Sequence, residues 1–447
     1  MHPKLRLWLL VLVPGILAGQ SHEPTDLERI LQRLDVLEQQ NRELMTEIRA
    51  LREQIASGTA ATASPPAAPP LAERVDVAEQ QVRGLAQDRI ESEHHSAVQL
   101  TGMVLFNSYA NGKYGDGGQD PVVAGPQAGD RVDGANLRQT ILGLKFQAPE
   151  RIAGAEVSGS AYVDLFGGSG ADLDQLVRLR IASIDFRWTN TTFSVALDKP
   201  IIAPRDPDSL AQVAFSPLTG AGNLWLWRPQ ARIEQRFRFG DSAGLRAQAG
   251  VLETSEAGNL PAEYSSGAPT GRPALEGRFV FWKQAAGNGD FEIAPGFHVS
   301  NSQLLGYSVP SRIVSLDWRV PLTRELTFTG AAFVGENLGV IGALRQGIVV
   351  TYSGAPSAVH GAGGWAQLEY RATRRLAFHV FGGQEDDRNR DLQTGLIAKN
   401  QSYGANALYQ IVSNVVASFE SAVVQTAYIG SPTRLNPHYD LAFAYLF

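Results

Sequence analysis

The sequence contains no cysteine, which excludes disulfide bonds, thiol catalysis and a lipid anchor on an N-terminal cysteine. Beyond the N-terminus it also lacks any run approaching the ~20 apolar residues that a membrane-spanning helix requires. The net charge of -6 is small for 447 residues, and no block of Lys and Arg marks a nucleic-acid partner. Any membrane insertion must therefore use strands, and nucleic-acid binding is not expected.

Signatures of enzymes and metal sites are missing as well. No Gly-x-Ser-x-Gly turn and no His-Glu-x-x-His helix occurs, and the eight His residues show no spacing typical of metal ligands. His94 and His95 adjoin each other ahead of the strand-rich region, and we interpret them as solvated. We therefore expect no enzyme, no cofactor and no bound metal.

Residues 1–20 have the three parts of a secretory signal peptide. Lys4 and Arg6 supply positive charge, an apolar run extends from Leu7 to Ala18, and small residues precede Ser21. An uncleaved membrane anchor is the alternative, but the apolar run is short for that purpose. The N-terminus therefore predicts an exported protein.

Residues 21–56 carry apolar residues in alternating steps of three and four, which would form one stripe, or seam, along a helix. Asn41 is the one polar residue at a position of this seam. The apolar seam positions are Leu27, Ile30, Leu34, Leu37, Leu44, Ile48, Leu51 and Ile55. Four heptads of this kind predict a coiled coil, although an amphipathic helix packed on its own domain is the alternative. Arg33 and Glu38 flank the seam in an Arg-apolar-x-x-apolar-Glu pattern that favours three chains.

Two short segments follow the coiled coil. Residues 57–70 contain four Pro and no bulky apolar side chain, which predicts an extended linker. Residues 71–96 resume the three-four spacing at Leu71, Val75, Ala78, Val82 and Leu85, which predicts a second short helix. Together these segments form a predicted stalk ahead of the main domain.

From residue 97 to residue 447 the periodicity changes from helical to two-residue, as expected of strands. The clear candidates span residues 98–110, 137–146, 156–166, 175–188, 192–197, 231–239, 274–282, 312–320, 326–334, 364–372, 376–381, 402–411 and 437–447. At about 22 residues for each strand and its connection, the region holds about 16 strands, within the even-numbered range of bacterial barrels. An array of soluble β-sandwiches is the alternative.

The last strand argues against soluble sandwiches. Tyr439, Leu441, Phe443, Tyr445 and Phe447 project to one side, and the chain ends on the aromatic residue. An apolar face with aromatic ends suits a bilayer and its interfaces. The terminal Phe also resembles the C-terminal signal that the barrel assembly machinery reads. We therefore predict an all-β protein, a transmembrane antiparallel barrel in the outer membrane, with its α-helical coiled coil in the periplasm.

Several strands carry charged residues on the face opposite the apolar one. The charged candidates are Arg178, Arg180, Asp185, Arg187, Arg232, Glu234, Arg236 and Arg238. In the first of these strands, Ile181 and Ile184 can both face lipid only if an irregularity near Ala182 and Ser183 resets the register. Arg facing lipid at the midplane costs about 2–4 kcal/mol, so these rows are expected to face water or protein.

The charged rows admit two interpretations. As pore-lining groups, permanently charged guanidinium groups would attract anions and bind carboxylates or phosphates through two hydrogen bonds. As structural groups, they would form ladders with Asp and Glu on neighbouring strands and support the wall. The first interpretation predicts a preference for small anionic solutes.

About 30 residues between the strands at 192–197 and 231–239 contain five Pro and no sustained alternation. An ordered loop of this length can fold into a barrel and narrow it. Arg205, Asp206, Asp208 and Arg228 would then line the narrow part. The alternative is an external loop that packs against a neighbouring subunit.

The run VRLRIASIDFRW, followed by DKPIIAPRDPDSLAQ and SPLTGAGNLWLWRPQARIEQRF, resembles the corresponding part of the DcaP-like porins. The order of signal, coiled coil, barrel and terminal Phe is also similar to that family. The resemblance implies a homotrimer of channels for passive diffusion of small anionic solutes, including dicarboxylates. The arrangement is more remotely similar to that of phosphate-selective porins, but the sequence lacks the many Lys residues expected of a phosphate pathway.

A structural tether or adhesin is the rival interpretation, with the coiled coil attaching and the barrel serving only as an anchor. Trimeric adhesins build one barrel from short segments of three chains, whereas this chain has enough predicted strands to close its own. A channel embedded in outer-membrane lipid is therefore the favoured reading.

Deletion of residues 21 to 93 tests whether self-association needs the stalk. We expect the barrels still to associate, because the Pro-rich linker joins stalk and barrel flexibly. Cross-linking or native mass measurement of the purified barrel in detergent would report its oligomeric state. A purely monomeric deletion variant would show instead that the stalk drives assembly.

Overall fold

The computed structural model describes residues 98–115, 118–168, 176–253, 272–285, 290–344, 346–351 and 353–447. The chain divides into two units, Met1–Ala86 and Gln87–Phe447, and all described residues belong to the second. The signal peptide, coiled coil, linker and second helix expected over residues 1–96 lie outside the described residues.

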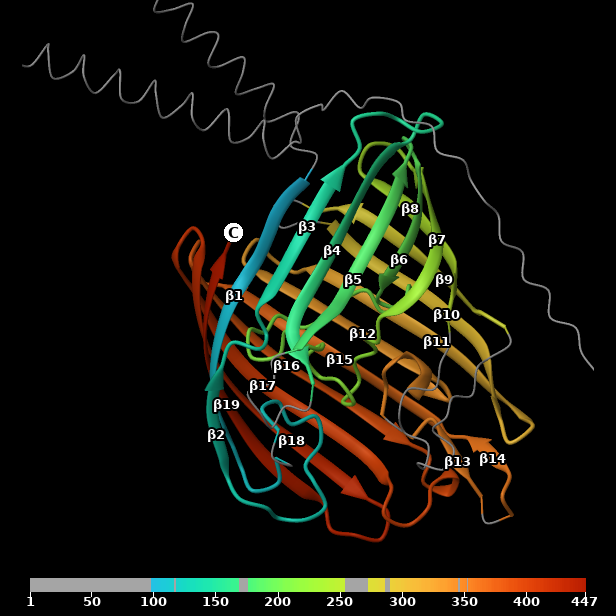
Figure 1. The fold of residues 1–447 in the computed structure, drawn as a ribbon, viewed down its shortest axis with the longest axis vertical. Coiled ribbons are helices and arrows are strands. Elements are labelled where there is room, and N and C mark those ends of the chain that lie inside the picture. Colours follow the sequence, from blue (N-terminus) through green and yellow to red (C-terminus); the bar gives the residue numbers. More distant parts are fainter. Residues whose placement is uncertain are drawn as a thin grey trace, which may run out of the picture. The chain divides into compact units, whose positions relative to one another are not determined.

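The described residues form strands and two short 3-10 helices (Figure 1). The strands of the main sheet are β1 (Val98–Asn111), β2 (Val132–Asn136), β3 (Ile141–Gln147), β4 (Glu156–Gly167), β5 (Leu176–Arg187), β6 (Thr191–Asp198), β7 (Arg228–Arg238), β8 (Ala243–Leu252), β9 (Ala274–Gln284), β10 (Asp290–Leu304), β11 (Tyr307–Pro321), β12 (Leu326–Glu336), β15 (His360–Arg371), β16 (Leu376–Asp387), β17 (Ile397–Val412), β18 (Val415–Tyr428) and β19 (Arg434–Leu446). Outside that sheet lie the hairpin of β13 (Ile348–Val350) and β14 (Pro356–Ala358), and the helices η2 (Leu338–Ile341) and η3 (Asn389–Asp391).

Each strand of the main sheet pairs antiparallel with its neighbours, and the sheet closes where β1 pairs with β19. β2 and β3 both pair with β1 and form one interrupted wall strand. Counted in this way, the 17 strands of the sheet make a closed barrel of 16. The predicted antiparallel barrel of about 16 strands is confirmed.

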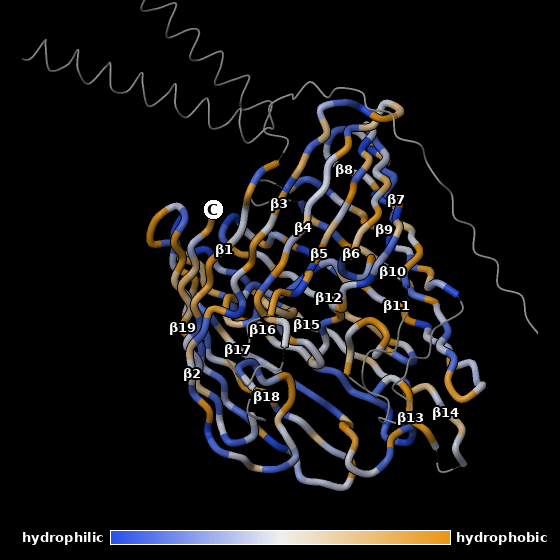
Figure 2. The backbone as a smooth tube through the Cα atoms, in the orientation of Figure 1, coloured by the Kyte–Doolittle hydropathy of each residue, from blue (hydrophilic) through white to orange (hydrophobic). Residues whose placement is uncertain are grey.

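The wall separates apolar from polar side chains by simple alternation, which Figure 2 shows as alternating colours along the strands. In β19 the Leu441 side chain is 44% exposed on the outer face, whereas neighbouring Ala442 is fully buried on the inner face. Tyr439, Phe443 and Tyr445 share the outer face with Leu441. An apolar outside and a polar inside are the pattern that lipid demands of a barrel.

The irregularity expected in β5 exists, but its predicted place near Ala182 and Ser183 is wrong. The register against β4 shifts between Leu179 and Ile181, so the extra residue is Arg180. Ile181 therefore lies opposite Tyr162, whose side chain lines an interior cavity, and does not face lipid as predicted. The bulge lets Arg178 and Arg180 converge on one partner, a constraint that the apolar pattern does not encode.

Besides the short strands β2, β13 and β14, three long strands were absent from the sequence-based candidates, namely β8, β10 and β18. β8 is rich in Ala and Gly, and β18 has apolar residues on both faces, so neither shows a clear alternation. β10 contains Pro295, which normally argues against a central strand. In the structure the β9–β10 ladder is interrupted at Ala294 and Pro295, where Pro has no N–H to donate.

The two ends of the barrel differ. At one end short connections join the strands, whereas the other end carries the long segments 112–131, 199–227 and 337–359. In outer-membrane barrels the short turns are periplasmic and the long loops extracellular. Among the described residues no helix is long and apolar enough to cross a bilayer.

The outer face of β19 predicts a depth-dependent cost of charge. Replacing Leu441 with Arg near the strand's midpoint should lower the free energy of unfolding in lipid by about 2–4 kcal/mol. Replacing Leu435, which is 49% exposed near the long-loop end, should cost only about 0–1 kcal/mol. Urea titration in vesicles measures both, and equal costs would contradict the assignment of β19 to the bilayer.

Candidate functional site

The segment between β6 and β7, residues 199–227, lies inside the barrel and is called the inner loop here. Its backbone and side chains contact wall residues from strands distributed around the barrel. These wall partners are Asn107 on β1, Arg178 and Arg180 on β5, Glu276 on β9, Asp317 on β11, Gln367 on β15, Asn400 and Asn406 on β17, and Glu420 on β18. The inner loop therefore crosses the interior of the barrel rather than extending outside it.

The inner loop approaches the wall so closely that one position tolerates only Gly. Gly222 has a φ of 100°, and a Cβ atom there would lie 2.2 Å from the Gly364 carbonyl oxygen. It would also lie 2.6 Å from the Gln384 carbonyl oxygen. Any larger residue would push the loop away from β15 and β16.

At its start the inner loop is held by the carboxylate of Glu276. Glu276 Oε2 accepts the N–H of Ile201 at 2.5 Å, and Oε1 accepts the Nδ1–H of His298 at 2.8 Å. His298 Nε2 lies 3.0 Å from Ser300 Oγ, which completes the order of a Ser-His-Glu catalytic triad. Ser300, however, is only 5% exposed, and its partners are used to fix the loop. We assign this group a structural role.

Arg205 fixes the next part of the loop through two acidic residues of the wall. Its Nε donates to Asp317 Oδ1 at 2.7 Å, and its Nη2 pairs with Glu292. Asp317 also pairs with Arg278, and Glu292 also pairs with Arg246. Burial alone would lower the pKa of Arg205, but the two carboxylates outweigh burial and raise that pKa above its ordinary value.

Arg178 and Arg180 meet a single buried carboxylate. Arg178 Nη2 lies 2.6 Å and Arg180 Nη1 lies 2.8 Å from Asp164 Oδ2, and the Asp164 side chain has no exposed surface. The same two guanidinium groups donate to the Ala214 and Val213 carbonyl oxygens of the inner loop. They therefore join wall and loop.

Asn400, which is fully buried on β17, connects the inner loop with the first loop, residues 112–131. Its Nδ2 donates to the Val122 carbonyl at 2.9 Å and to the Gly220 carbonyl at 2.8 Å. Its Oδ1 accepts from Thr426 Oγ1, which in turn accepts the N–H of Ala124. The side-chain amide of Asn400 thus joins the first loop and the inner loop to β17.

The 337–359 loop also packs on the inner loop. Ile341 accepts the N–H groups of Trp225 and Leu226 at 3.2 and 3.3 Å, and the two loops share an apolar cluster with β11 and β12. Arg228, at the start of β7, is 6% exposed and donates to the Val340 carbonyl at 2.9 Å. The position of Arg228 suits a role in holding this loop.

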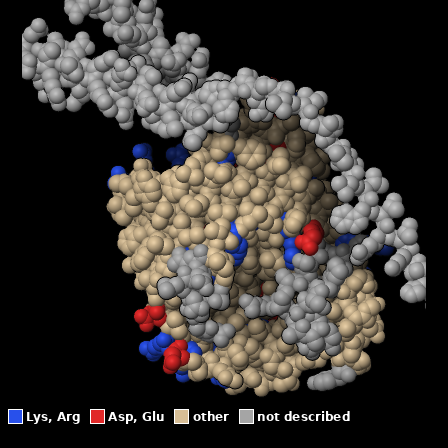
Figure 3. All heavy atoms as spheres, in the orientation of Figure 1, with Lys and Arg blue, Asp and Glu red and all other residues tan. Residues whose placement is uncertain are grey.

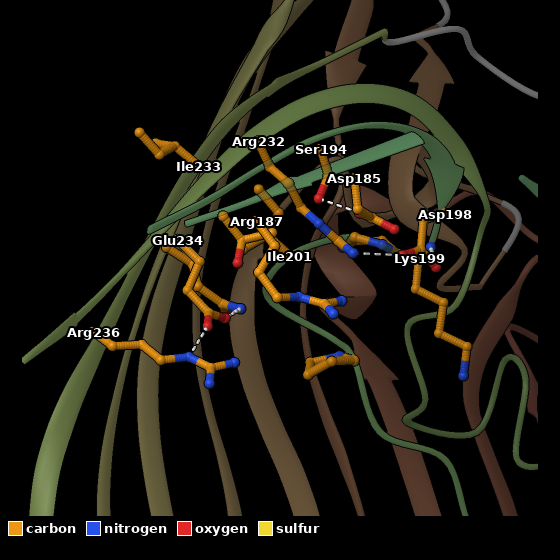
Figure 4. A pocket seen from close by; sticks show the side chains of 14 residues that line it. Asp185, Arg187, Ser194, Asp198, Lys199, Ile201, Arg232, Ile233, Glu234 and Arg236 are labelled. Carbon is orange, nitrogen blue, oxygen red and sulfur yellow. Dashed lines mark hydrogen bonds and ion pairs between the residues drawn. The ribbon is translucent and has the colours of Figure 1, made fainter. Parts of the chain in front are cut away.

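Towards the short-turn end the interior opens into a cavity of about 390 Å³ (Figure 4). Its charged lining residues are Asp185, Arg187, Asp198, Lys199, Arg232, Glu234 and Arg236. Arg232 pairs with Asp198 at 2.9 Å, and Arg236 pairs with Glu234 at 2.7 Å. Asp185 accepts hydrogen bonds from Ser183 and Ser194.

Two neighbouring cavities share residues with this one. A cavity of about 710 Å³ shares Asp185 and Arg187 and adds Lys145, and one of about 360 Å³ shares Arg236 and adds Arg238. Within the described part of the chain, Lys145, Arg187 and Arg238 have no hydrogen bond or ion pair through their side chains. Charged side chains appear around the hollow in Figure 3, whereas most of the wall visible beside it is uncharged.

The remaining two sequence candidates lie on the inner loop. Asp206 pairs with Lys199 and accepts a hydrogen bond from Asn223 at 3.1 Å. Asp208 accepts a hydrogen bond from Gln367 at 2.6 Å, and its side chain is 59% exposed. The sequence thus predicted charged residues both on the barrel wall and on the inner loop, but it did not predict which of them pair.

Several interior residues were not among the sequence candidates. Lys145, Asp164 and Glu276 lie on inner faces of predicted strands, whose alternation alone would have placed them there, whereas Glu292 was missed together with its strand, β10. Arg246 was missed together with its strand, β8. Across the described residues, no group of three or more His, Cys, Asp and Glu side chains is placed to hold a metal ion.

The barrel is similar in fold to solved structures of outer-membrane channels. The outer membrane channel DcaP of Acinetobacter baumannii matches with a TM-score of 0.61 at 17% identity, covering 78% of this chain and 97% of that chain. An anion-selective porin from Comamonas acidovorans matches with a TM-score of 0.55 at 10% identity, covering 78% and 99%.

No protein-family model matches the chain, and no curated protein matches it in sequence. The resemblance to the DcaP-like porins is therefore confirmed by the fold, with DcaP itself among the structural neighbours. At sequence identities of 17% and 10%, these matches establish the fold of the chain.

The shared carboxylate predicts strongly non-additive effects on stability. Arg178→Ala alone leaves Asp164 paired with Arg180 and should cost about 1 kcal/mol, whereas the double variant with Arg180→Ala leaves a buried unpaired charge and should cost about 3–5 kcal/mol. Adding Asp164→Asn to the double variant should restore part of that loss. Thermal unfolding in detergent measures all three, and purely additive losses without rescue would contradict the structural role.

Proposed function

We propose that the protein is an outer-membrane porin for passive diffusion of small hydrophilic solutes, with a preference for anions such as dicarboxylates. The observation that carries the proposal is the inner loop, which lies within a closed barrel and leaves cavities lined by charged side chains. A narrowed, water-filled passage with fixed charges is what a selective pore requires.

The contrast between engaged and available cations supports the anion preference. Arg178, Arg180 and Arg205 are committed to carboxylates and to loop carbonyls, so their charge is largely compensated. Arg187 and Arg238 line the cavities near the short turns and have no ion pair with any described residue. Available guanidinium groups raise the local concentration of anions and bind carboxylates through paired hydrogen bonds.

A tether or adhesin with the barrel as a mere anchor explains less. An anchor needs an apolar outer wall, but it has no need of a loop held inside by contacts with strands around the barrel. The anchored inner loop therefore favours transport as the function.

Further parts of the proposal concern partners and location. The chain is proposed to form homotrimers in outer-membrane lipid, with a periplasmic coiled coil over residues 21–56. Phe447 is proposed as the residue that the barrel assembly machinery reads. The N–H and carbonyl of Phe447 pair with Gly102 of β1, so this residue belongs to the seam of the barrel.

Charge removal at the two available guanidinium groups tests the preference. Arg187→Gln with Arg238→Gln should lower the chloride-to-potassium permeability ratio by about twofold to fivefold for each lost charge, as expected for about 0.4–1 kcal/mol of interaction in a wet lumen. Reversal potentials in planar bilayers under a salt gradient measure this ratio.

Arg312→Gln is the matched control, because it removes the same charge from the outer wall, where the Arg312 side chain is 70% exposed. That variant should leave the ratio unchanged. Absence of conductance in the unaltered protein would refute the channel, and a preference for potassium would refute the anionic solutes.

A further inference from the structure

Four aromatic rings, one on β4 and three in the second half of the inner loop, form a continuous row. Phe166 of β4 meets Phe215 edge-to-face at 5.7 Å between centroids, and Phe215 meets Trp225 at 6.2 Å. Trp225 meets Trp227 edge-to-face at 5.5 Å. All four side chains are only partly buried, so the row keeps exposed ring surface. A row that served only as core would be expected to be fully covered.

Three guanidinium groups pack on the faces of these rings. Arg138 lies 4.4 Å from the centroid of Phe166. Arg178 and Arg180 lie 5.1 and 4.9 Å from the centroid of Trp227. Cations at these distances are attracted by the ring faces. The row of rings therefore has fixed positive charge at both of its ends, Phe166 and Trp227.

Among the described residues, the positive charge around the rings exceeds the negative charge that pairs with it. Asp164 is the single carboxylate paired with Arg178 and Arg180, and the Nη1 group of Arg178 donates to no described residue. Arg138 is 5% exposed, yet its Nε and Nη2 atoms are buried without an acceptor among the described residues. A buried guanidinium with two unpaired nitrogen atoms is costly, so this arrangement favours an anion nearby.

Asp120 of the first loop lies near Arg138 but does not supply that anion. No hydrogen bond joins the two among the described residues, and both Asp120 carboxyl oxygens are buried without a partner. Burial raises the pKa of Asp120 well above its ordinary range, and the neighbouring Asp440 and Glu420 act in the same direction. Without a hydrogen bond from Arg138, Asp120 leaves the Nε and Nη2 groups of Arg138 unpaired among the described residues.

From these observations we propose that the aromatic row with Arg138, Arg178 and Arg180 is a binding site for anions that carry an aromatic ring, such as aromatic carboxylates. The ligand's ring packs on the part of the Phe215 and Trp227 rings that the guanidinium groups leave uncovered, and its carboxylate accepts from guanidinium N–H groups that have no other acceptor. The inference rests on the proposed channel function and names one class of solute that the channel retains and selects.

A comparison of two monocarboxylates of similar size tests the proposal. Benzoate has an aromatic ring, whereas cyclohexanecarboxylate has the same charge and a saturated ring. In planar bilayers holding the full-length protein, benzoate should halve the chloride current at an about threefold to tenfold lower concentration than cyclohexanecarboxylate. This comparison needs no variant and therefore does not depend on the folding of one.

Variants then assign the effect to these rings. Phe215→Leu and, separately, Trp227→Leu should reduce the difference between the two anions to less than twofold. Trp318→Leu is the matched control, because Trp318 lies on the opposite, outer face of the wall from the inward-facing Asp317 and packs on Phe328 at 5.7 Å. This control should retain the full difference.

The outcomes separate this inference from the proposed function. Equal block by the two carboxylates, with chloride preference intact, would overturn the aromatic site and leave the anion channel standing. A benzoate effect that survives both Leu variants would overturn the assignment to the aromatic row. Loss of chloride preference in the unaltered protein would overturn the proposed function itself.

Discussion

The inner loop depends on a supply of hydrogen-bond partners from the surrounding wall. A segment without regular secondary structure has backbone groups that neither helix nor sheet satisfies, and burial of such groups is costly. Here Glu276 accepts from Ile201, Gln139 accepts from Val213 and Ala214, and Asn400 donates to Gly220. The polar inner face of the barrel therefore serves first to satisfy the hydrogen-bonding groups of the inner loop.

This requirement divides the interior Arg residues into two groups. Arg178, Arg180 and Arg205 combine an ion pair with contacts to the loop, and each is held within a network of two or more partners. Arg187 and Arg238 line open cavities instead. The planar guanidinium group serves both purposes, because it offers several donors in a fixed geometry and stays charged when partly buried. Residue type alone cannot tell the two groups apart.

Much of the barrel could be predicted from the sequence because the bilayer imposes a strict two-residue period. The outer face of β19 follows from that period, and the count of about 16 strands follows from the length of the region that shows it. β8 and β18 escaped prediction, because small side chains or apolar residues on both faces hide the alternation. The bulge at Arg180 escaped precise placement, because its position is set by the convergence of two guanidinium groups on Asp164 rather than by apolar pattern.

The candidate site was predictable only in part, for a related reason. Alternation locates inward-facing charges such as Arg187 and Glu234, but pairing depends on neighbouring strands and on the path of the inner loop. Asp164 pairs with Arg groups of the adjacent strand β5, but Glu276 and Glu292 lie 75 and 87 residues from Ile201 and Arg205, the loop residues that they hold. Their roles become visible only when the closed barrel brings them together.

The distribution of loop contacts also constrains the order of assembly. Partners of the inner loop come from β1, β5, β9, β11, β15, β17 and β18, which span almost the whole chain. Contacts between residues so far apart in sequence form late, since the entropy of closing long loops must be overcome first. The docked loop is therefore a product of barrel closure, and a maturing barrel passes through a wider state before its interior is narrowed.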